Sequence, residues 1–439
     1  MNNLRLIKTR YLVTVNDDFE VLERAAVVLS DDLIEEIISS QDIETWVQQH
    51  PAAKIIELDQ HVLMPGLVNT HTHASMSLMR GIADDLPLME WLQEHIWPAE
   101  SQWVDRQFIE DGVNLAAAEM IRGGTTCFND MYFFPDIMAR SCQQIGIRAV
   151  AGLIVLDFPT VWAQSSDEYL SKAMTVLDEL KAMPLVSPAL APHAPYTVAD
   201  EPLSRIAMYS NELELPVHMH VHETAFEVDE AVKNNGMRPL QRLDQLGLLN
   251  PNLLAVHMTA LEPMEIDRLA ETGVNVVHCP ESNLKLASGI CPVAQLQQQG
   301  VNVALGTDGA ASNNDLDMFG EMRTAALLCK GIAGDASRCN AEQSIRKATI
   351  NGARSLGLGD QIGSIEAGKK ADLIAVDLSA LNTQPVYDPV AQLVYAANSQ
   401  QVSHVWIDGK PKLIAGEFTD IDKVAILAKA GEWQTKLSG

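Results

Sequence analysis

The chain has 439 residues, is poor in basic side chains and lacks long apolar runs. Lys and Arg number 31 against 58 Asp and Glu, which gives a formal net charge of −27 at pH 7. Phosphate backbones and anionic lipid surfaces repel so acidic a chain, and we therefore expect neither nucleic acid nor a membrane as a partner. No stretch approaches the roughly 18 apolar residues that a membrane-spanning helix needs.

Cysteine is also scarce: the six cysteines are scattered, without a C-x-x-C pair. The start, "MNNLRLIKTRYLVTVNDDFE", has no apolar segment of the kind that signal peptides carry. We therefore expect reduced thiols and a cytoplasmic protein rather than a disulfide framework. No G-x-G-x-x-G opens a helix, which argues against a dinucleotide-binding doubly wound sheet.

The two ends of the chain share a period-two pattern of apolar residues. It is seen in "LRLIKTRYLVTV" near the start and in "KADLIAVDLS" and "SHVWIDGKPKLIAG" near the end. Alternation with turn signals such as Asp-Gly is typical of half-buried strands. We predict one small β-sandwich made from residues 1–60 and 366–439, the second part also carrying a C-terminal helix.

Residues 61–365 alternate short apolar runs with helical patterns, which predicts βα units and a parallel sheet. There are eight such runs: "HVLMPGLVNTHTH", "TTCFND", "RAVAGLIVLD", "LVSPALAPH", "LPVHMHVHE", "LLAVHMT", "VNVVHCP" and "VNVALGTD". Eight parallel strands over about 300 residues fit a (β/α)₈ TIM-type barrel. The predicted fold class is therefore α/β, a barrel with a β-sandwich built from both chain ends.

Most of the apolar runs end on a chemically capable side chain: His73, Asp130, His193, Glu223, His257, His278 and Asp308. In such barrels the catalytic groups lie at the carboxyl ends of the strands. Side chains alternate along a strand, so His71 and His73 point to the same side and can bind one metal ion together.

Histidines are concentrated at these strand ends, and neutral imidazole is the commonest metal ligand. In "VHMHVHE", His218, His220 and His222 alternate along the predicted strand and share one face, so any of the three could be the third metal ligand. Nitrogen and oxygen ligands without thiolate suit Zn²⁺, and Fe²⁺ or Mn²⁺ would also suit. A metal with an open position activates water, so the pattern predicts hydrolytic attack on an electrophilic carbon. The H-x-E and P-C-x-x-C signature of one class of zinc deaminases is absent.

Five segments together resemble the amidohydrolase superfamily: "PGLVNTHTHASMSLMRG", "APHAPYTV", "HVHETAFE", "HCPESNLKLASG" and "GTDGAASNNDLDMFGEMRTAAL". Within it they are similar to the 5-methylthioadenosine/S-adenosylhomocysteine deaminases. The family pattern places a ligand His three residues before a catalytic Glu, which selects His220. The resemblance thus implies His71, His73, His220 and Asp308 as ligands. "LVSPALAPH" lacks the Lys that bridges two metals in binuclear members, so one ion is expected.

The same resemblance implies the roles of the other site residues. Asp308 should take a proton from the attacking water and deliver it to the leaving ammonia. Glu223 should protonate a purine ring nitrogen, and His257 should hold or polarise the attacking hydroxide. Glu100 should accept hydrogen bonds from the ribose hydroxyls, and His193 should also contact the nucleoside. The expected catalytic residues are Glu223, His257 and Asp308, and the expected substrate contacts are Glu100, His193, Glu223 and Asp308.

Two loops are expected to decide which nucleoside binds. Apolar side chains in "ADDLPLMEWLQEHIWPAE" could cover the site as a lid, although a helix packed on the barrel would look the same. Residues 155–170 contain no Arg or Lys, whereas Phe158 and Trp162 suit a small apolar group. We predict that 5′-methylthioadenosine is preferred, adenosine is accepted and S-adenosylhomocysteine is poor.

Two other functions remain open from the sequence. One is a deaminase or chlorohydrolase of another N-heterocycle, such as a guanine-type purine or an s-triazine. The other is a catalytically inactive metal-binding scaffold, against which the complete set of candidate residues argues. The resemblance also implies a homo-oligomer, a dimer or a tetramer.

Overall fold

The computed structural model describes residues 4–438, and the chain divides into two compact units. One unit runs up to Val68 and also includes Met120–Cys127 and Asp317–Ile421. The other consists of Asn69–Glu119, Phe128–Leu316 and the stretch from Asp422 onward. Among residues 4–438, no helix is both long and apolar enough to cross a membrane.

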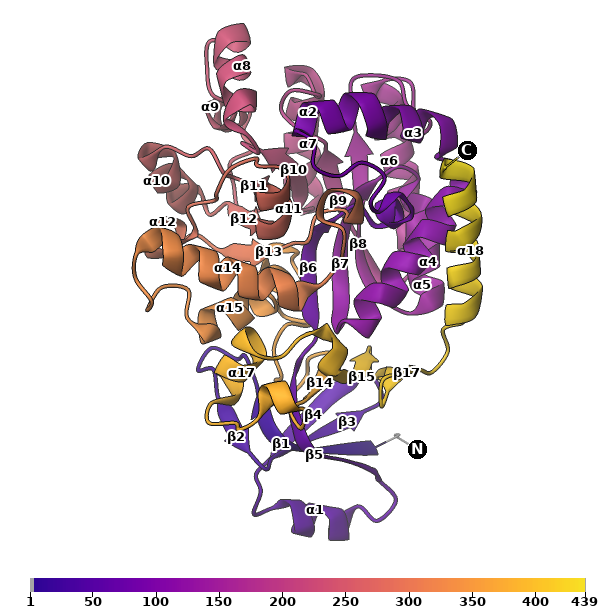
Figure 1. Cartoon of the computed structure of the whole chain (residues 1–439), viewed down its shortest axis with the longest axis vertical. Helices are drawn as coiled ribbons and strands as arrows, with labels where there is room; N and C mark the ends of the chain where they lie inside the picture. Colours follow the sequence, from indigo (N-terminus) through magenta and orange to yellow (C-terminus); the bar gives the residue numbers. More distant parts are fainter. Residues whose placement is uncertain (1–3, 439) are drawn as a thin grey trace. The chain divides into compact units, whose positions relative to one another are not determined.

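Eight strands form one sheet in strictly sequential order, from β6 to β13 (Figure 1). They are β6 (Leu67–Thr72), β7 (Thr125–Tyr132), β8 (Arg148–Val155), β9 (Val186–Pro192), β10 (Val217–Val221), β11 (Leu253–His257), β12 (Asn275–His278) and β13 (Val303–Leu305). The pairing is parallel from β8 to β13. The first strand, β6, also contacts the last strand, β13, and the loop after it: Thr70 Oγ1 donates to Leu305 O at 2.7 Å, and the N–H of Asp308 donates to His71 O at 3.0 Å. The predicted α/β barrel is therefore present and nearly closed.

Helices follow the strands, and several begin at a capping side chain. They are η1 (Ala74–Met79), α2 (Leu88–Glu90), η2 (Trp91–Ile96), α3 (Trp97–Trp103), α4 (Arg106–Arg122), α5 (Pro135–Ile145), α6 (Ser166–Leu180), α7 (Asp200–Leu213), α8 (Ala225–Asn235), α9 (Pro239–Gln245), α10 (Pro263–Thr272), α11 (Pro280–Lys285), α12 (Val293–Gln298), α13 (Ala310–Asn313) and α18 (Lys423–Leu437). At the start of α8, Thr224 Oγ1 accepts the N–H of Glu227, which fixes where the helix leaves β10.

The second sheet is mixed and contains strands from both chain ends, as predicted. Its order is β17-β16-β15-β14-β5-β1-β3-β4, with β2 paired to β1. The strands are β1 (Leu4–Val13), β2 (Val21–Glu23), β3 (Ala26–Ser30), β4 (Leu33–Ile38), β5 (Lys54–Pro65), β14 (Leu373–Asp377), β15 (Val402–Ile407), β16 (Lys410–Ile414) and β17 (Glu417–Phe418). The remaining helices of this unit are α1 (Ile43–Gln49), α14 (Met318–Ala333), α15 (Ala341–Lys347), α16 (Ile350–Ser355), η3 (Leu381–Thr383), α17 (Pro389–Tyr395) and η4 (Ser399–Gln401).

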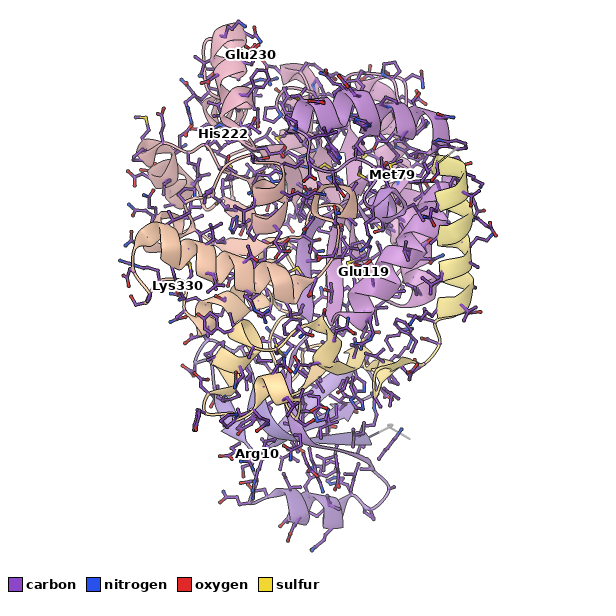
Figure 2. All side chains as sticks on the ribbon, viewed as in Figure 1. Arg10, Met79, Glu119, His222, Glu230 and Lys330 are labelled. Carbon is purple, nitrogen blue, oxygen red and sulfur yellow. A yellow bond between two sulfur atoms is a disulfide. The ribbon has the colours of Figure 1, made fainter. Side chains whose placement is uncertain are left out.

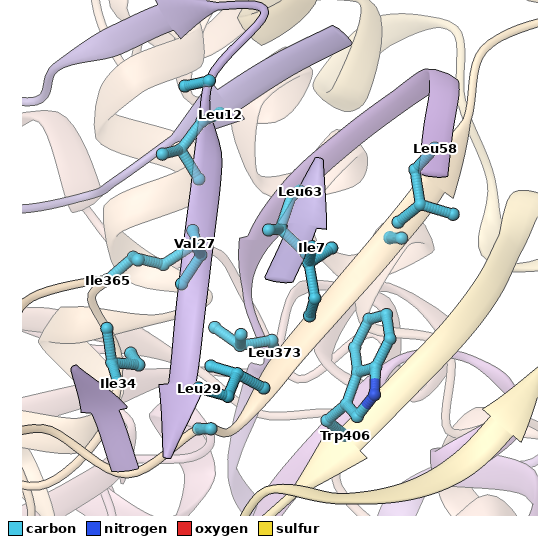
Figure 3. Close-up of a cluster of buried hydrophobic side chains, with 13 residues drawn as sticks. Ile7, Leu12, Val27, Leu29, Ile34, Leu58, Leu63, Ile365, Leu373 and Trp406 are labelled. Atoms are coloured by element: carbon cyan, nitrogen blue, oxygen red, sulfur yellow. The ribbon is translucent and has the colours of Figure 1, made fainter. Parts of the chain in front are cut away.

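Alternate residues of these strands make the core of the mixed sheet (Figure 3). Ile7 and Leu63 come from the two parallel strands β1 and β5, and Leu373 and Trp406 come from the antiparallel pair β14 and β15. All four are at most 1% exposed. The period-two pattern at the two chain ends thus reflects one shared apolar layer.

Two expectations from the sequence are wrong. The apolar run that begins at His61 is not one strand, because β5 ends at Pro65 in the mixed sheet and β6 begins at Leu67 in the barrel. Gly66 stands between them, where a β-carbon would lie 2.0 Å from Thr126 Oγ1. The cysteines are not all reduced either, since Cys329 and Cys339 form a disulfide, whereas the other four are buried thiols.

Candidate active site

Five side chains from four places in the barrel converge at the carboxyl ends of its strands. His71 and His73 come from the end of β6, His220 from β10, His257 from the end of β11 and Asp308 from just after β13. The Oδ1 atom of Asp308 lies 3.2 Å from His71 Nε2 and 3.3 Å from His73 Nε2. Two overlapping groups have ligand atoms within 4.8 Å of one another: His71, His73 and Asp308, and His71, His220 and His257.

Two histidines of this cluster are oriented by hydrogen bonds to their Nδ1 nitrogens. His73 Nδ1 lies 2.6 Å from Met131 O, and His220 Nδ1 lies 2.7 Å from His193 O. A carbonyl can only accept, so both rings carry their proton on Nδ1 and leave Nε2 free to bind a metal. His71 Nε2 is buried and, although it lies 3.2 Å from Asp308 Oδ1, makes no well-aligned hydrogen bond. These residues fit a zinc ion with nitrogen and oxygen ligands.

The backbone around this cluster is tightly constrained. A β-carbon at Gly306 would lie 2.8 Å from both the β-carbon and the backbone nitrogen of His71, so only glycine lets β13 approach β6 this closely. Asp308 and His257 adopt positive φ angles of 62° and 76°. A left-handed conformation costs a non-glycine residue about 1–3 kcal/mol and is common where function requires it.

Asp308 is held as a charged carboxylate. Its Oδ2 accepts hydrogen bonds from Ser282 Oγ at 2.7 Å and Ser312 Oγ at 2.8 Å, and its Oδ1 accepts the N–H of Gly309 at 2.8 Å. Burial raises the pKa of Asp308, but the neighbouring imidazoles of His71 and His73 outweigh it and hold that pKa well below its usual value. Asp308 is therefore ionised at neutral pH.

Glu223, which follows β10, has the opposite electrostatic environment. Burial raises its pKa, the nearby charge of Asp308 raises it further, and His257 opposes the shift. Ser288 Oγ lies 3.4 Å from Glu223 Oε1, and His257 Nε2 lies 3.9 Å from Glu223 Oε2. Glu227 fixes the turn by accepting the N–H of Glu223 at 2.8 Å. Two carboxyl groups whose pKa values move apart can act as an acid and a base in one reaction.

His257 is oriented by a residue that the sequence did not reveal. Its Nδ1 lies 2.9 Å from Asn283 Oδ1, so the ring donates from Nδ1 and its Nε2 faces Glu223 and the cavity. Asn283 and Ser282 lie 26 residues from their partners in the sequence, whereas Ser312 lies four residues after Asp308. The segment "PESNLKLASG" by itself looks like an ordinary turn and short helix.

A cavity of about 420 Å³ brings together all the residues expected at the site except His71, which lies just beneath its wall. The polar residues of its lining include His73, Glu100, His193, His220, Glu223, His257, Asp308 and Ser312. Its apolar wall comes from the segments 88–97 and 154–161, with Leu88, Trp91, Leu92, Ile96, Trp97, Ile154, Leu156, Phe158, Pro159 and Val161. Residues 88–97, for which the sequence left a lid and a packed helix open, line this cavity.

Trp162, by contrast, does not line the cavity. Its ring packs against Phe134 with centroids 5.0 Å apart, and Lys172 Nζ lies 4.9 Å from its centroid. Of the two aromatic residues expected to form an apolar slot, only Phe158 is in position.

Glu100, on α3, forms a pair with Tyr132 in the cavity wall. The Tyr132 hydroxyl donates to Glu100 Oε1 at 2.6 Å. Burial raises the pKa of Glu100 to about 7, although the Tyr132 hydrogen bond lowers it. Tyr132 was not predicted, because the apolar run "TTCFND" ends at Asp130. The alternation continues, however, and β7 reaches Tyr132 on the same side as Asp130.

His193, just after β9, is a neutral group in the cavity. Its Nδ1 lies 3.1 Å from Thr197 Oγ1. Burial, followed by the charges of His73 and His71, lowers the pKa of His193 to about 3. It can therefore exchange hydrogen bonds with a substrate without carrying charge.

A larger hollow of about 1130 Å³ adjoins the cavity and shares Phe158, Tyr196 and Glu223 with it. One wall is α8, which carries Glu230 and projects away from the strands (Figure 2). The acidic residues of its lining are Asp157, Asp200, Glu201, Glu223, Glu227 and Glu230. The lining has one cation, Arg242, which is already bound to Asp200 Oδ1 at 2.6 Å and to two backbone carbonyls.

Comparisons with known proteins agree on one family. The amidohydrolase family profile matches residues 62–412. A 5-methylthioadenosine/S-adenosylhomocysteine deaminase of Teredinibacter turnerae is 50% identical over 413 residues, which cover 94% of this chain and 92% of its own. A deaminase of the same name from Saccharophagus degradans is 48% identical over 434 residues, covering 98% and 96% of the two chains.

Two solved structures are also similar to this chain. The zinc-bound structure of an adenosine deaminase from Xanthomonas campestris has a TM-score of 0.95 and 52% identity, covering 99% of this chain and 98% of its own. A zinc-bound atrazine chlorohydrolase from Arthrobacter aurescens has a TM-score of 0.91 over 98% of this chain and 99% of its own. At 22% identity the latter likeness establishes a common fold only.

Proposed function

The chain belongs to the amidohydrolase family, and from this premise we propose that it is a zinc-dependent deaminase of 5′-methylthioadenosine, which it converts with water to 5′-methylthioinosine and ammonia. One observation carries the proposal: the base Asp308 and the acid Glu223 face one cavity beside a cluster of metal-ligating histidines. The deaminase relatives and the zinc in the Xanthomonas campestris structure support it.

His71, His73, His220 and Asp308 would hold the zinc ion. When bound, zinc lowers the pKa of water towards neutrality, so that hydroxide becomes available at physiological pH. We propose one ion per chain, because β9 (Val186–Pro192) offers no lysine as a bridging ligand.

The two carboxyl groups divide the proton transfers. Asp308 accepts a proton from the attacking water while Glu223 gives a proton to the ring nitrogen next to the carbon under attack. Oxygen bonds to that carbon, the carbon–nitrogen bond to the amino group breaks, and ammonia leaves with the proton that Asp308 held. The hydroxyl proton returns to Glu223 as the carbonyl forms. General acid–base steps of this kind are worth about 10²–10⁴-fold each.

His257 orients the attacking hydroxide in this scheme. Asn283 Oδ1 accepts a hydrogen bond from the Nδ1–H of His257, so the Nε2 atom that faces the cavity is an acceptor. It can accept a hydrogen bond from the attacking water and thereby direct an oxygen lone pair at the substrate carbon.

Glu100 and His193 bind the nucleoside. As an ionised carboxylate, Glu100 can accept a hydrogen bond from each of two ribose hydroxyls, and Tyr132 fixes its orientation. His193 supplies a neutral ring to the same cavity lining, next to Tyr196.

The cavity favours a small apolar 5′ substituent over one that ends in a carboxylate. Its lining contains no Lys or Arg, and in the adjoining hollow Arg242 is already neutralised by Asp200. An unpartnered carboxylate in such surroundings costs at least a few kcal/mol. A methylthio group packed against Leu156 and Phe158 gains roughly 1–2 kcal/mol instead. We therefore propose the order methylthioadenosine, then adenosine, then S-adenosylhomocysteine.

The test is a comparison of kcat/KM for these three nucleosides, with guanine and an s-triazine as further substrates. The proposal predicts the highest value for methylthioadenosine and a Phe158→Ala loss that is larger for it than for adenosine. Equal values for S-adenosylhomocysteine and methylthioadenosine would mean that the homocysteine tail extends into water and selects nothing. Turnover of guanine or the triazine alone would replace the proposal with its alternative. A cytoplasmic homo-oligomer, dimeric or tetrameric, remains a prediction.

A further inference from the structure

His218 is a buried histidine of the barrel that the proposed reaction does not use. It lies on β10 two residues before His220, so its side chain occupies the next layer down in the barrel interior. It is fully buried and does not line the cavity. His222, the third histidine of the segment, lies beyond the strand and is held by backbone groups, with its Nδ1 3.1 Å from Ala260 O.

The polar contact of His218 is with a metal ligand. His218 Nε2 lies 2.8 Å from His71 Nδ1, and the two rings are close to perpendicular, at 79°. β6 and β10 are four positions apart in the eight-stranded sheet, so this hydrogen bond spans the barrel interior. The other nitrogen, His218 Nδ1, is buried without a hydrogen-bond partner.

Only one of the two ways to place the shared proton suits a metal. If His71 Nδ1–H donates to His218 Nε2, the Nε2 atom of His71 keeps its lone pair for the metal. If His218 donates instead, neutral His71 carries its proton on Nε2, 3.2 Å from Asp308 Oδ1, and cannot bind. His73 and His220 are each fixed by a backbone carbonyl, which can only accept. The acceptor facing His71 Nδ1 is a side chain and can be replaced.

We propose that His218 is a positioning residue for the metal site: its Nε2 accepts a hydrogen bond from the Nδ1–H of His71, so that His71 Nε2 faces the zinc ion with a free lone pair. Outer partners of ligand histidines generally change metal affinity by about 10–100-fold. This inference depends on a metal at the histidine cluster and not on the identity of the substrate.

The test is zinc affinity, measured by competition between apo-protein and a chromogenic chelator. His218→Leu removes the acceptor and should weaken zinc binding by about 10–100-fold. His218→Gln places an amide oxygen where Nε2 was and should keep the affinity close to that of the wild type. His222→Gln, a buried histidine on the same segment that makes no contact with His71, should leave zinc affinity unchanged.

The outcomes separate the proposal from general damage to the barrel. Wild-type zinc affinity in His218→Leu, or equal losses in the Leu and Gln variants, would overturn it. The proposal stays testable if His218→Leu does not fold, because a long-range ¹H–¹⁵N spectrum of zinc-loaded wild-type protein labelled in its histidines reports the tautomers. The expected form of His71 carries its proton on Nδ1, and a proton on Nε2 would overturn the proposal. None of these readouts involves deamination, so failure of the proposed function would leave the result intact.

Discussion

Replacement of Tyr132 by Phe removes one hydroxyl from the wall of the cavity and leaves the ring. The hydroxyl donates to Glu100 Oε1 at 2.6 Å, in surroundings that raise the pKa of Glu100 to about 7. Hydrogen bonds to charged groups are worth about 1.5–3 kcal/mol, which corresponds to roughly 10- to 150-fold in an equilibrium constant. We therefore expect KM for methylthioadenosine to rise within this range, with a smaller change in kcat.

The rise of KM in Tyr132→Phe should also depend on pH, and the direction of this dependence follows from the effect of the hydroxyl on the pKa of Glu100. The Tyr132 hydrogen bond lowers the pKa of Glu100, so without it that pKa rises further and the carboxyl becomes largely protonated at neutral pH. A protonated Glu100 accepts ribose hydroxyls less well. The KM defect should be largest near neutral pH and shrink as the pH rises well above the pKa of Glu100.

The assay is steady-state deamination across this pH range, with 5′-methylthioadenosine and its 2′,3′-dideoxy analogue. The analogue lacks the hydroxyls, so Tyr132→Phe should barely change its KM. Tyr395→Phe, a partly exposed tyrosine in the other unit, is the matched control. If both substrates weaken equally, or if the defect does not depend on pH, Glu100 and Tyr132 do not act on the ribose as proposed.

Other substitutions test the metal cluster and the proton transfers. His71→Ala and Asp308→Ala should each abolish turnover and reduce bound zinc from about one ion per chain; two ions in the wild type, measured by metal analysis, would rule out the single-metal proposal. Glu223→Gln should lose about 10²–10⁴-fold in kcat yet retain its zinc, because Glu223 is not expected to be a ligand; near wild-type kcat would remove Glu223 from the mechanism.

The barrel and the positions of its main polar groups were predictable because both follow from local patterns. Eight apolar runs gave the strands, and the alternation of side chains put His71 and His73 on one face. Such patterns do not show how strands from different parts of the chain share sheets. The run from His61 divides at Gly66 because β5 pairs with β14, more than 300 residues later in the chain.

The residues that orient Asp308 and His257 could not be predicted from sequence patterns either. Ser282 meets Asp308, and Asn283 meets His257, only after distant loops fold over the barrel, whereas Ser312 lies four residues after Asp308. A serine or an asparagine in a turn looks the same whether it caps the local backbone or orients a distant side chain. Tyr132 is the exception, because continuing the alternation past Asp130 would have found it.

The central claim is that the zinc-loaded protein releases ammonia from an adenine nucleoside. The most direct test follows ammonia and nucleoside together when purified protein is given 5′-methylthioadenosine with zinc, after chelation, and after zinc is restored. We expect one ammonia for each methylthioadenosine consumed, loss of the activity on chelation and its recovery with zinc. Full activity in metal-free protein, or no ammonia from any adenine nucleoside with one zinc ion bound per chain, would contradict the account.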